Sequence, residues 1–243
     1  YMYSLPSNKL ELWAAIEADR FTNPVLREFY KEKDVIMEEK RMGESNAFGK
    51  LLDDFMAVAF KNHMYRSWVI GCMSDLKHIS RTDAEAWFDK WYRAKNLTAV
   101  IVGDVDPNTA MPILEKYLGK IPAGEKPSQY VSEEPPQRAE KRIIMEDPSQ
   151  PFLVVAYHKP AFDDPDNAVY DAIADILGGG RSSRLYTSLV KEKKVAMYAG
   201  TYTELGRKYP GLFLFFAVPN QGKTAEDCEK AIYEEIEKLK TTP

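Results

Sequence analysis

Apolar residues recur along this chain at two spacings, one typical of helices and the other typical of strands. Spacings of three and four residues predict amphipathic helices. These helices are expected near residues 8–20, 24–42, 51–59, 82–91, 108–118, 165–177, 182–192 and 225–239. In the second helix, Pro24 occupies the first position, where its missing N–H costs little, and Gly43 marks the end.

Short apolar or alternating runs bounded by Gly, Pro or Asp predict strands. They lie at residues 1–5, 97–105, 141–145, 152–158, 196–203 and 212–218. A strand, a turn and an amphipathic helix follow one another twice, at 97–118 and at 212–239, which indicates two copies of one α+β unit. Because the chain opens on the alternating residues 1–5, we expect further chain before Tyr1.

The stretch from residue 122 to 139 separates the two copies. It contains four prolines, several charges and few apolar residues, a composition typical of a linker.

Composition narrows the possible functions. The 243 residues are 44% hydrophobic, which is enough to bury a sizeable core. The formal net charge is −4 and both signs are interspersed, which argues against a general nucleic-acid binder. No apolar run approaches the roughly 18 residues of a membrane-spanning helix. Cys72 and Cys228 lack metal-type spacing and are interpreted as free thiols.

Two carboxylates in the second predicted helix are the strongest candidates for chemistry. Glu32 and Glu39 are seven residues apart and therefore fall on nearly the same helix face. Val35 and Ile36 lie between them on that face and are expected to point inward. Because a buried carboxylate is costly unless it is paired or bound to a metal, two explanations stay open, an ion pair and a zinc-ligand role. The lysines available for pairing are Lys31, Lys33 and Lys40.

A complete zinc site cannot be assembled from local motifs. The chain has three histidines, His63, His78 and His158, and no two of them are spaced to share a helix face. It contains neither H-x-x-E-H nor H-E-x-x-H.

The stretch from Glu32 to Glu39 resembles the second active-site segment of the pitrilysin/insulinase family of zinc metallopeptidases, the inverzincins. In that family an H-x-x-E-H helix supplies two zinc-binding histidines and the catalytic glutamate, and a later helix supplies a third, glutamate ligand. The resemblance places this metal ligand at Glu39. It places at Glu32 an acidic residue of the catalytic machinery that hydrogen-bonds to the zinc ligands.

Further segments are similar to family signatures and follow in the family's order across nearly the whole chain. They are residues 63–65, 69–71, 74–76, 91–97, 102–105, 118–122 and 178–186. Met64 departs from the pattern, because the family usually has proline there.

The resemblance implies an α+β fold, an antiparallel sheet with helices packed on one face. Residues 1–125 would form the C-terminal part of a first, zinc-binding peptidase domain. Residues 126–135 would be the Pro-rich linker, and residues 136–243 a second homologous domain without metal ligands.

The implied function is a zinc-dependent endopeptidase that hydrolyses peptides or unfolded polypeptides inside a two-domain chamber. The histidine segment is expected before Tyr1, so this chain alone is expected to be truncated and inactive. One alternative is a catalytically silent family subunit that completes a partner's chamber. A binding or scaffold module on the same fold is the other.

The resemblance also sets expectations for partners and location. The expected partner is a peptide substrate, with a homodimer or a paired subunit of the same family possible and no nucleic acid or membrane span. The similarity is greatest to bacterial members that carry export signals, which suggests a periplasmic or secreted protein.

Overall fold

The computed structural model describes residues 1–241 and divides the chain into two compact units. The helical unit comprises Tyr1–Glu44 and Ser67–Glu133. The sheet unit comprises Ser45–Arg66 and the chain from Glu134 onward. The division therefore assigns residues 45–66 to the sheet unit, although they precede the linker in sequence. The predicted domain boundary at residues 126–135 stays a prediction.

The helical unit contains helices and irregular chain. Its elements are η1 (Ser7–Lys9), α1 (Leu10–Thr22), α2 (Phe29–Ser45), α4 (Met73–His78), α5 (Arg81–Trp91), η3 (Ala94–Asn96) and α6 (Pro107–Leu118). α5 begins with a capping box in which Ser80 and Asp83 bond to each other's backbone N–H. α1 and α6 pack together, and Glu11 accepts hydrogen bonds from Lys116 and Tyr117 at 2.9 Å each.

α2 differs from its predicted bounds at both ends. It begins at Phe29, because residues 24–28 form loop and turn after Pro24, and it continues through Gly43 to Ser45. Asn46 makes the real interruption, since its side chain accepts the N–H groups of Phe48 and Gly49 and caps α3.

Two predicted strands of the helical unit are wrong. Residues 1–5 and 97–105 are extended or irregular chain and pair with no strand among residues 1–241. Val100 is 78% exposed and Val102 is 89% exposed, whereas Leu97, Ile101 and Val105 are half-buried, so the run at 97–105 packs on one side only. A strand needs a hydrogen-bonded neighbour as well as a suitable sequence.

The sheet unit contains a three-stranded antiparallel sheet in the order β1-β3-β2. Its elements are α3 (Ala47–Ala59), η2 (Met64–Arg66), β1 (Leu153–Lys159), α7 (Asn167–Gly178), the π-helical η4 (Tyr186–Glu192), β2 (Ala196–Leu205), β3 (Gly211–Pro219) and α8 (Ala225–Thr241). The central strand β3 pairs Phe215 with Val155 of β1 and with Thr201 of β2.

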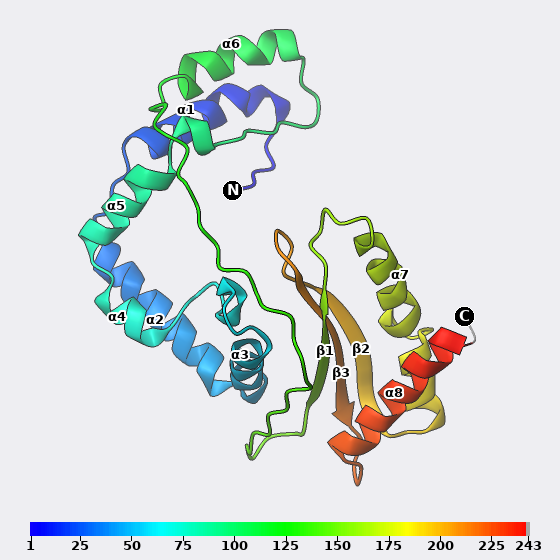
Figure 1. The fold of residues 1–243 in the computed structure, drawn as a ribbon. Coiled ribbons are helices and arrows are strands. Elements are labelled where there is room, and N and C mark those ends of the chain that lie inside the picture. Colours follow the sequence, from blue (N-terminus) through cyan, green and yellow to red (C-terminus); the bar gives the residue numbers. More distant parts are fainter. Residues whose placement is uncertain (242–243) are drawn as a thin grey trace. The chain divides into compact units, whose positions relative to one another are not determined.

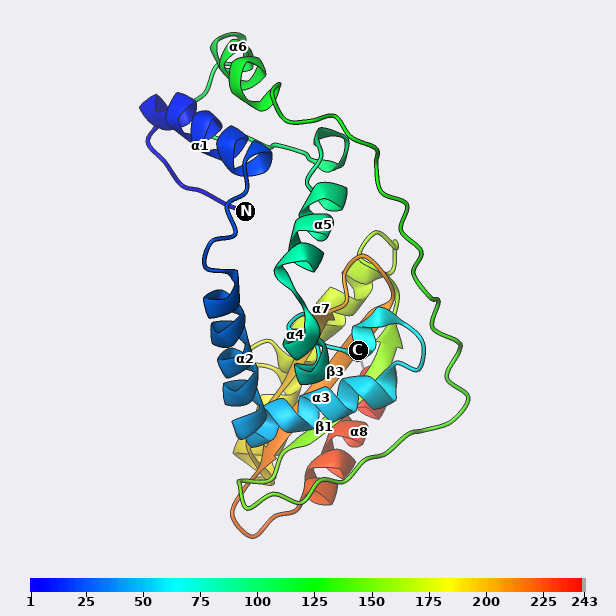
Figure 2. The same cartoon turned by 90° about the vertical axis from the view of Figure 1, so that its left-hand side faces the viewer.

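The main core lies between one face of this sheet and the helices α7 and α8, which Figure 1 shows on the same side of the strands. Its most buried members are Leu177, Leu185, Leu189, Ala196, Ala199, Phe213, Phe215, Ala217, Cys228, Ala231 and Ile232. α3 lies on the opposite face of the sheet (Figure 2). The α+β class with an antiparallel sheet is therefore confirmed.

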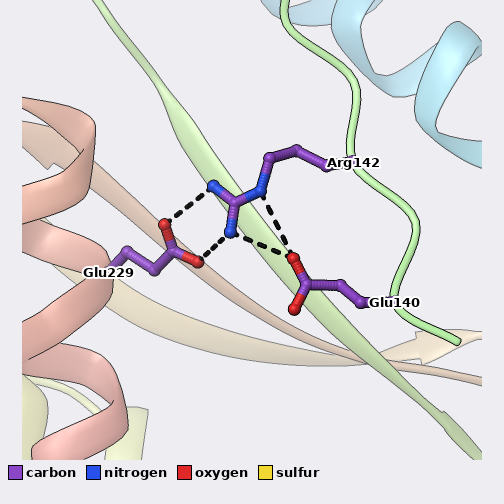
Figure 3. Close-up of polar contacts among 3 residues, drawn as sticks. All are labelled: Glu140, Arg142 and Glu229. Atoms are coloured by element: carbon purple, nitrogen blue, oxygen red, sulfur yellow. Dashed lines mark hydrogen bonds and ion pairs between the residues drawn. The ribbon is translucent and has the colours of Figure 1, made fainter.

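The predicted strand at residues 141–145 is also wrong, because this segment forms no ladder with β1 or with other described residues. Side chains hold it instead. Lys141 Nζ donates to the carbonyl of Val58 at 2.7 Å, and Arg142 donates to both carboxylate oxygens of Glu229 on α8 at 2.9 and 2.5 Å (Figure 3). Glu140 accepts from the same guanidinium at 3.1 Å. The two carboxylates raise the pKa of Arg142.

None of the helices within residues 1–241 is long and apolar enough to cross a bilayer.

Candidate functional site

α2 carries both sequence-predicted site residues. Glu32 lies in its first turn and Glu39 two turns later, and both side chains are exposed. Seven residues of helix span about 10 Å, so the two carboxylates lie on one face but cannot both bind the same ion directly. This geometry is compatible with different tasks for the two residues, one as a ligand and the other as a supporting group.

The lysines near these carboxylates have other partners. Lys31 lies 3.6 Å from Glu28, and Lys40 lies 3.7 Å from Glu44. Lys33 donates to the carbonyls of Lys77 and Ile79 at 2.8 and 2.9 Å. Within residues 1–241, the structure therefore shows none of these lysines in an ion pair with Glu32 or Glu39.

Both carboxylates are consequently free of partners in the part of the chain that the structure describes. Neither the Glu32 nor the Glu39 side chain has a hydrogen-bond or ion-pair partner among the residues that the structure describes. An exposed carboxylate without a partner costs little and stays available to a ligand.

The expectation that Val35 and Ile36 point into a core is wrong in this chain. Val35 is 55% exposed and Ile36 is 40% exposed, and the buried residue of α2 is Lys40. The carboxylates therefore share an open face of α2 with apolar side chains. Because neither Glu32 nor Glu39 is buried, no metal is needed to compensate for the burial of their charges.

A surface pocket of about 540 Å³ lies at the start of α2. Glu32 contributes to its wall, together with Val25, Leu26, Arg27, Glu28 and Phe29. The pocket places apolar and charged groups next to Glu32, whereas Glu39 lies outside it.

The fit of these residues to zinc is partial. A free glutamate can occupy one position of a zinc site, which usually needs three protein ligands for catalysis. Within residues 1–241, no group of three or more His, Cys, Asp or Glu side chains is placed to hold a metal ion. The described part of the chain thus offers Glu39 as a single ligand and does not complete a site.

A second polar cluster, in the sheet unit, was not predicted from the sequence. His63 is 4% exposed, and the carboxylate of Glu134 accepts its backbone N–H at 3.0 Å. The two residues are 71 positions apart, and Glu134 lies in the predicted linker. The sequence carries no signal for such a contact, although His63 lies within a motif of the family resemblance.

The glycine-rich segment after α7 forms a tight turn. Gly180 has a φ of +84°, and Leu185 behind it is fully buried in the core. A Cβ atom on Gly178 would lie 2.4 Å from the backbone nitrogen of Thr201, so α7 and β2 approach closely only because Gly178 has no side chain. These features identify the segment as a tight turn that lets α7 pack closely on β2.

Comparisons with known proteins extend over nearly the whole chain. A profile of the family described as "Peptidase M16 inactive domain" matches residues 78–243. Zinc protease PqqE of Helicobacter pylori is 30% identical over 218 residues, which cover 88% of this chain and 49% of that protein. The chain thus spans about half the length of this relative.

Solved structures agree with this finding. The crystal structure of a protease from Helicobacter pylori matches with a TM-score of 0.90 and 27% identity, over 98% of this chain and 59% of that one. A peptidase M16 inactive domain from Pseudomonas fluorescens matches with a TM-score of 0.78 and 19% identity, over 98% of this chain and 58% of that one. The second likeness shows the fold alone.

Proposed function

Because the chain belongs to the peptidase M16 family, we propose that it is part of a zinc-dependent endopeptidase to which it contributes one metal ligand, Glu39. Family membership confirms the resemblance to the pitrilysin/insulinase peptidases. The observation that carries the proposal is the exposed carboxylate of Glu39 on α2, which has no partner among the described residues. The resemblance in sequence assigns the family's third ligand to this residue. The zinc protease name of the Helicobacter pylori relative supports it.

The roles of the two carboxylates follow from their positions on α2. Glu39 would bind the metal through a side-chain oxygen, and Glu32, about two helical turns away, would accept hydrogen bonds from neighbouring ligands and fix their orientation. Bound zinc would supply Lewis-acid polarisation of the scissile carbonyl and of a water molecule. The two histidines and the general base would come from a segment outside these 243 residues.

The wider proposal concerns the intact protein. It would cleave peptides or unfolded polypeptides within a chamber formed by two homologous domains. Residues 1–125 would belong to the zinc-binding domain, residues 126–135 to the linker, and residues 136–243 to a domain without metal ligands. The 243-residue chain alone would be inactive, and the protein would be periplasmic or secreted.

A second candidate is a catalytically silent subunit that pairs with an active partner of the same family. The description of the matched family profile as an inactive domain favours it. The two candidates differ in one observable, because only the endopeptidase binds zinc through Glu39.

Cleavage of an unfolded polypeptide such as casein by the intact protein tests the proposal. We expect cleavage that a chelator abolishes and added zinc restores. Glu32→Gln should lower kcat/KM by about 10–100-fold, because a lost partner of the metal ligands typically has that effect. Unchanged activity of Glu32→Gln would remove Glu32 from the machinery, and chelator-resistant cleavage would refute the zinc mechanism.

A further inference from the structure

The loop at residues 61–66 is held by a carboxylate that the proposed zinc site does not use. Glu134 accepts three consecutive backbone N–H groups, from Lys61 at 2.7 Å, Asn62 at 2.8 Å and His63 at 3.0 Å. Successive N–H groups aimed at one anion form a nest. Burial raises the pKa of Glu134, but the three donors outweigh burial and hold this pKa below its usual range. Glu134 is therefore an anion that ties the linker to this loop.

The imidazole of His63 is the buried part of the same loop. Its Nδ1 accepts the backbone N–H of Tyr65 at 3.1 Å, so Nδ1 carries no proton and the neutral ring is protonated at Nε2. The ring packs at centroid distances of 4.3 Å from Tyr65, 5.1 Å from Tyr209 and 6.0 Å from Phe60. Nε2 is buried and has no hydrogen-bond partner among residues 1–241. These surroundings suit the neutral ring, in which Nδ1 is an acceptor, and the described residues offer no hydrogen-bond acceptor to Nε2.

Tyr65 connects the loop to the turn between β2 and β3. Its hydroxyl accepts the backbone N–H of Tyr209 at 3.3 Å. Its ring also packs closely on Gly206, where an added Cβ would lie 2.8 Å from the ring, and Gly206 has a φ of +90°. The loop thus fits into the β2–β3 turn through Tyr65, and His63 fixes the backbone of Tyr65.

We propose that His63 is an acid-sensitive latch, in which protonation of Nδ1 breaks the hydrogen bond from Tyr65 and releases residues 61–66 from the β2–β3 turn. The chain leaves the sheet unit after Arg66 and returns to it at Glu134. The latch and the Glu134 nest therefore fix to the sheet unit the two chain segments on either side of residues 67–133, which belong to the helical unit. Acid would loosen this attachment while the core between the sheet, α7 and α8 stays intact.

The groups around His63 set the direction of the pH response. Burial lowers the pKa of His63, and the nearby Glu134 opposes this only in part. The ring of His158 on β1 packs against Phe60, with the two ring centroids 5.3 Å apart. Burial lowers the pKa of His158 as well. Lys141, whose charge helps to lower the pKa of His158, lies beside this loop, and the loop itself carries the cations Lys61 and Arg66. The titratable rings of Tyr65 and Tyr209 also pack on His63.

The lowered pKa of His63 determines how closure of the loop depends on pH. The open loop has the ordinary histidine pKa of about 6.5 and binds a proton more readily than the closed loop. Closure is therefore fully favoured above about pH 6.5 and weakens as the pH falls below that value. One proton linked to opening changes the opening equilibrium by up to about tenfold per pH unit.

Hydrogen exchange of the intact protein between pH 7.5 and 5, corrected for intrinsic rates, tests the latch. We expect protection of the amides at residues 61–65 and 209 to fall by up to about tenfold per pH unit below about pH 6.5. His63→Gln keeps a side-chain oxygen that can accept from Tyr65 but does not titrate, so its protection should not depend on pH. The exposed His78 on α4 gives the matched control His78→Gln, which should behave as wild type.

Two outcomes would overturn the proposal. The first is the same pH dependence in wild type and His63→Gln, and His158→Gln would then show whether the second histidine is responsible. The second outcome is measured in wild type alone, so it tests the latch even if His63→Gln does not fold. If protection of the β3 amides falls together with that of residues 61–65, acid unfolds the sheet unit globally and no latch exists.

Discussion

Glu39→Gln is expected to abolish peptide cleavage by the intact protein, lowering kcat/KM by more than about 100-fold. Loss of a group that merely supports a metal ligand already lowers activity by about 10–100-fold, and loss of the ligand itself should exceed this. A neutral amide replaces an anionic oxygen donor, while the shape of the side chain is kept. The effect should be chemical, because Glu39 is exposed and its side chain has no hydrogen-bond or ion-pair partner among residues 1–241 whose loss would unfold α2.

Glu38→Gln is the matched control for this substitution. Glu38 is the preceding residue of α2, is exposed, and forms an ion pair with Arg41 at 2.9 Å. An exposed pair of this kind contributes about 0.3–0.5 kcal/mol, so the control should retain its activity and nearly all its stability. Equal activities of the two variants, measured at equal folded concentration, would remove Glu39 from the mechanism.

Gly178→Ala is expected to destabilise the sheet unit by about 3 kcal/mol, the upper end of the range for overpacked cores. The added Cβ would lie 2.4 Å from the backbone nitrogen of Thr201 and 2.2 Å from its hydroxyl oxygen. Backbone atoms of a strand that is hydrogen-bonded to its neighbour cannot move aside cheaply, so α7 and β2 must separate. The hydrogen bond from the Thr201 hydroxyl to the carbonyl of Ala174, 3.0 Å long, would be lost as well.

Gly180→Ala separates this clash from a conformational effect. A Cβ on Gly180 would meet no atom within 4 Å, but its φ of +84° strains any other residue by about 1–2 kcal/mol. Urea unfolding curves of both variants give the comparison. If the Gly178→Ala midpoint lies at or above that of Gly180→Ala, the close approach of α7 to β2 is not a stability determinant.

Sequence patterns predicted the helices well where capping chemistry is local. Ser80 and Asp83 form the capping box of α5 within four consecutive residues, and the helix predicted near residue 82 begins at Arg81. The bounds of α2 could not be obtained in this way. Pro24 permits a helix start without requiring one, and Gly43 weakens a helix without ending it.

Strands were predicted reliably only where a partner exists. The runs at 152–158, 196–203 and 212–218 became β1, β2 and β3, because each finds its neighbours within the sheet unit. The run at 97–105 has an equally apolar sequence but no neighbouring strand among the described residues, and it stays irregular. Pairing is a long-range property that a local pattern does not contain.

The same distinction between local and long-range features applies to the candidate site. Glu32 and Glu39 could be found because helical spacing and a family motif lie in one short segment. Their free, exposed state was not foreseen, because periodicity placed Val35 and Ile36 in a core that this chain does not form around α2. The contact between His63 and Glu134 joins residues 71 positions apart and has no local signature.

Zinc content of the intact protein, measured alongside Glu39→Gln and Glu38→Gln, decides whether Glu39 is a metal ligand. We expect about one zinc per chain in wild type and in Glu38→Gln, and loss of that zinc in Glu39→Gln. Absence of zinc from wild type, or its retention by Glu39→Gln, would contradict the assignment of Glu39 as a metal ligand. Absence from wild type would also favour the silent-subunit candidate.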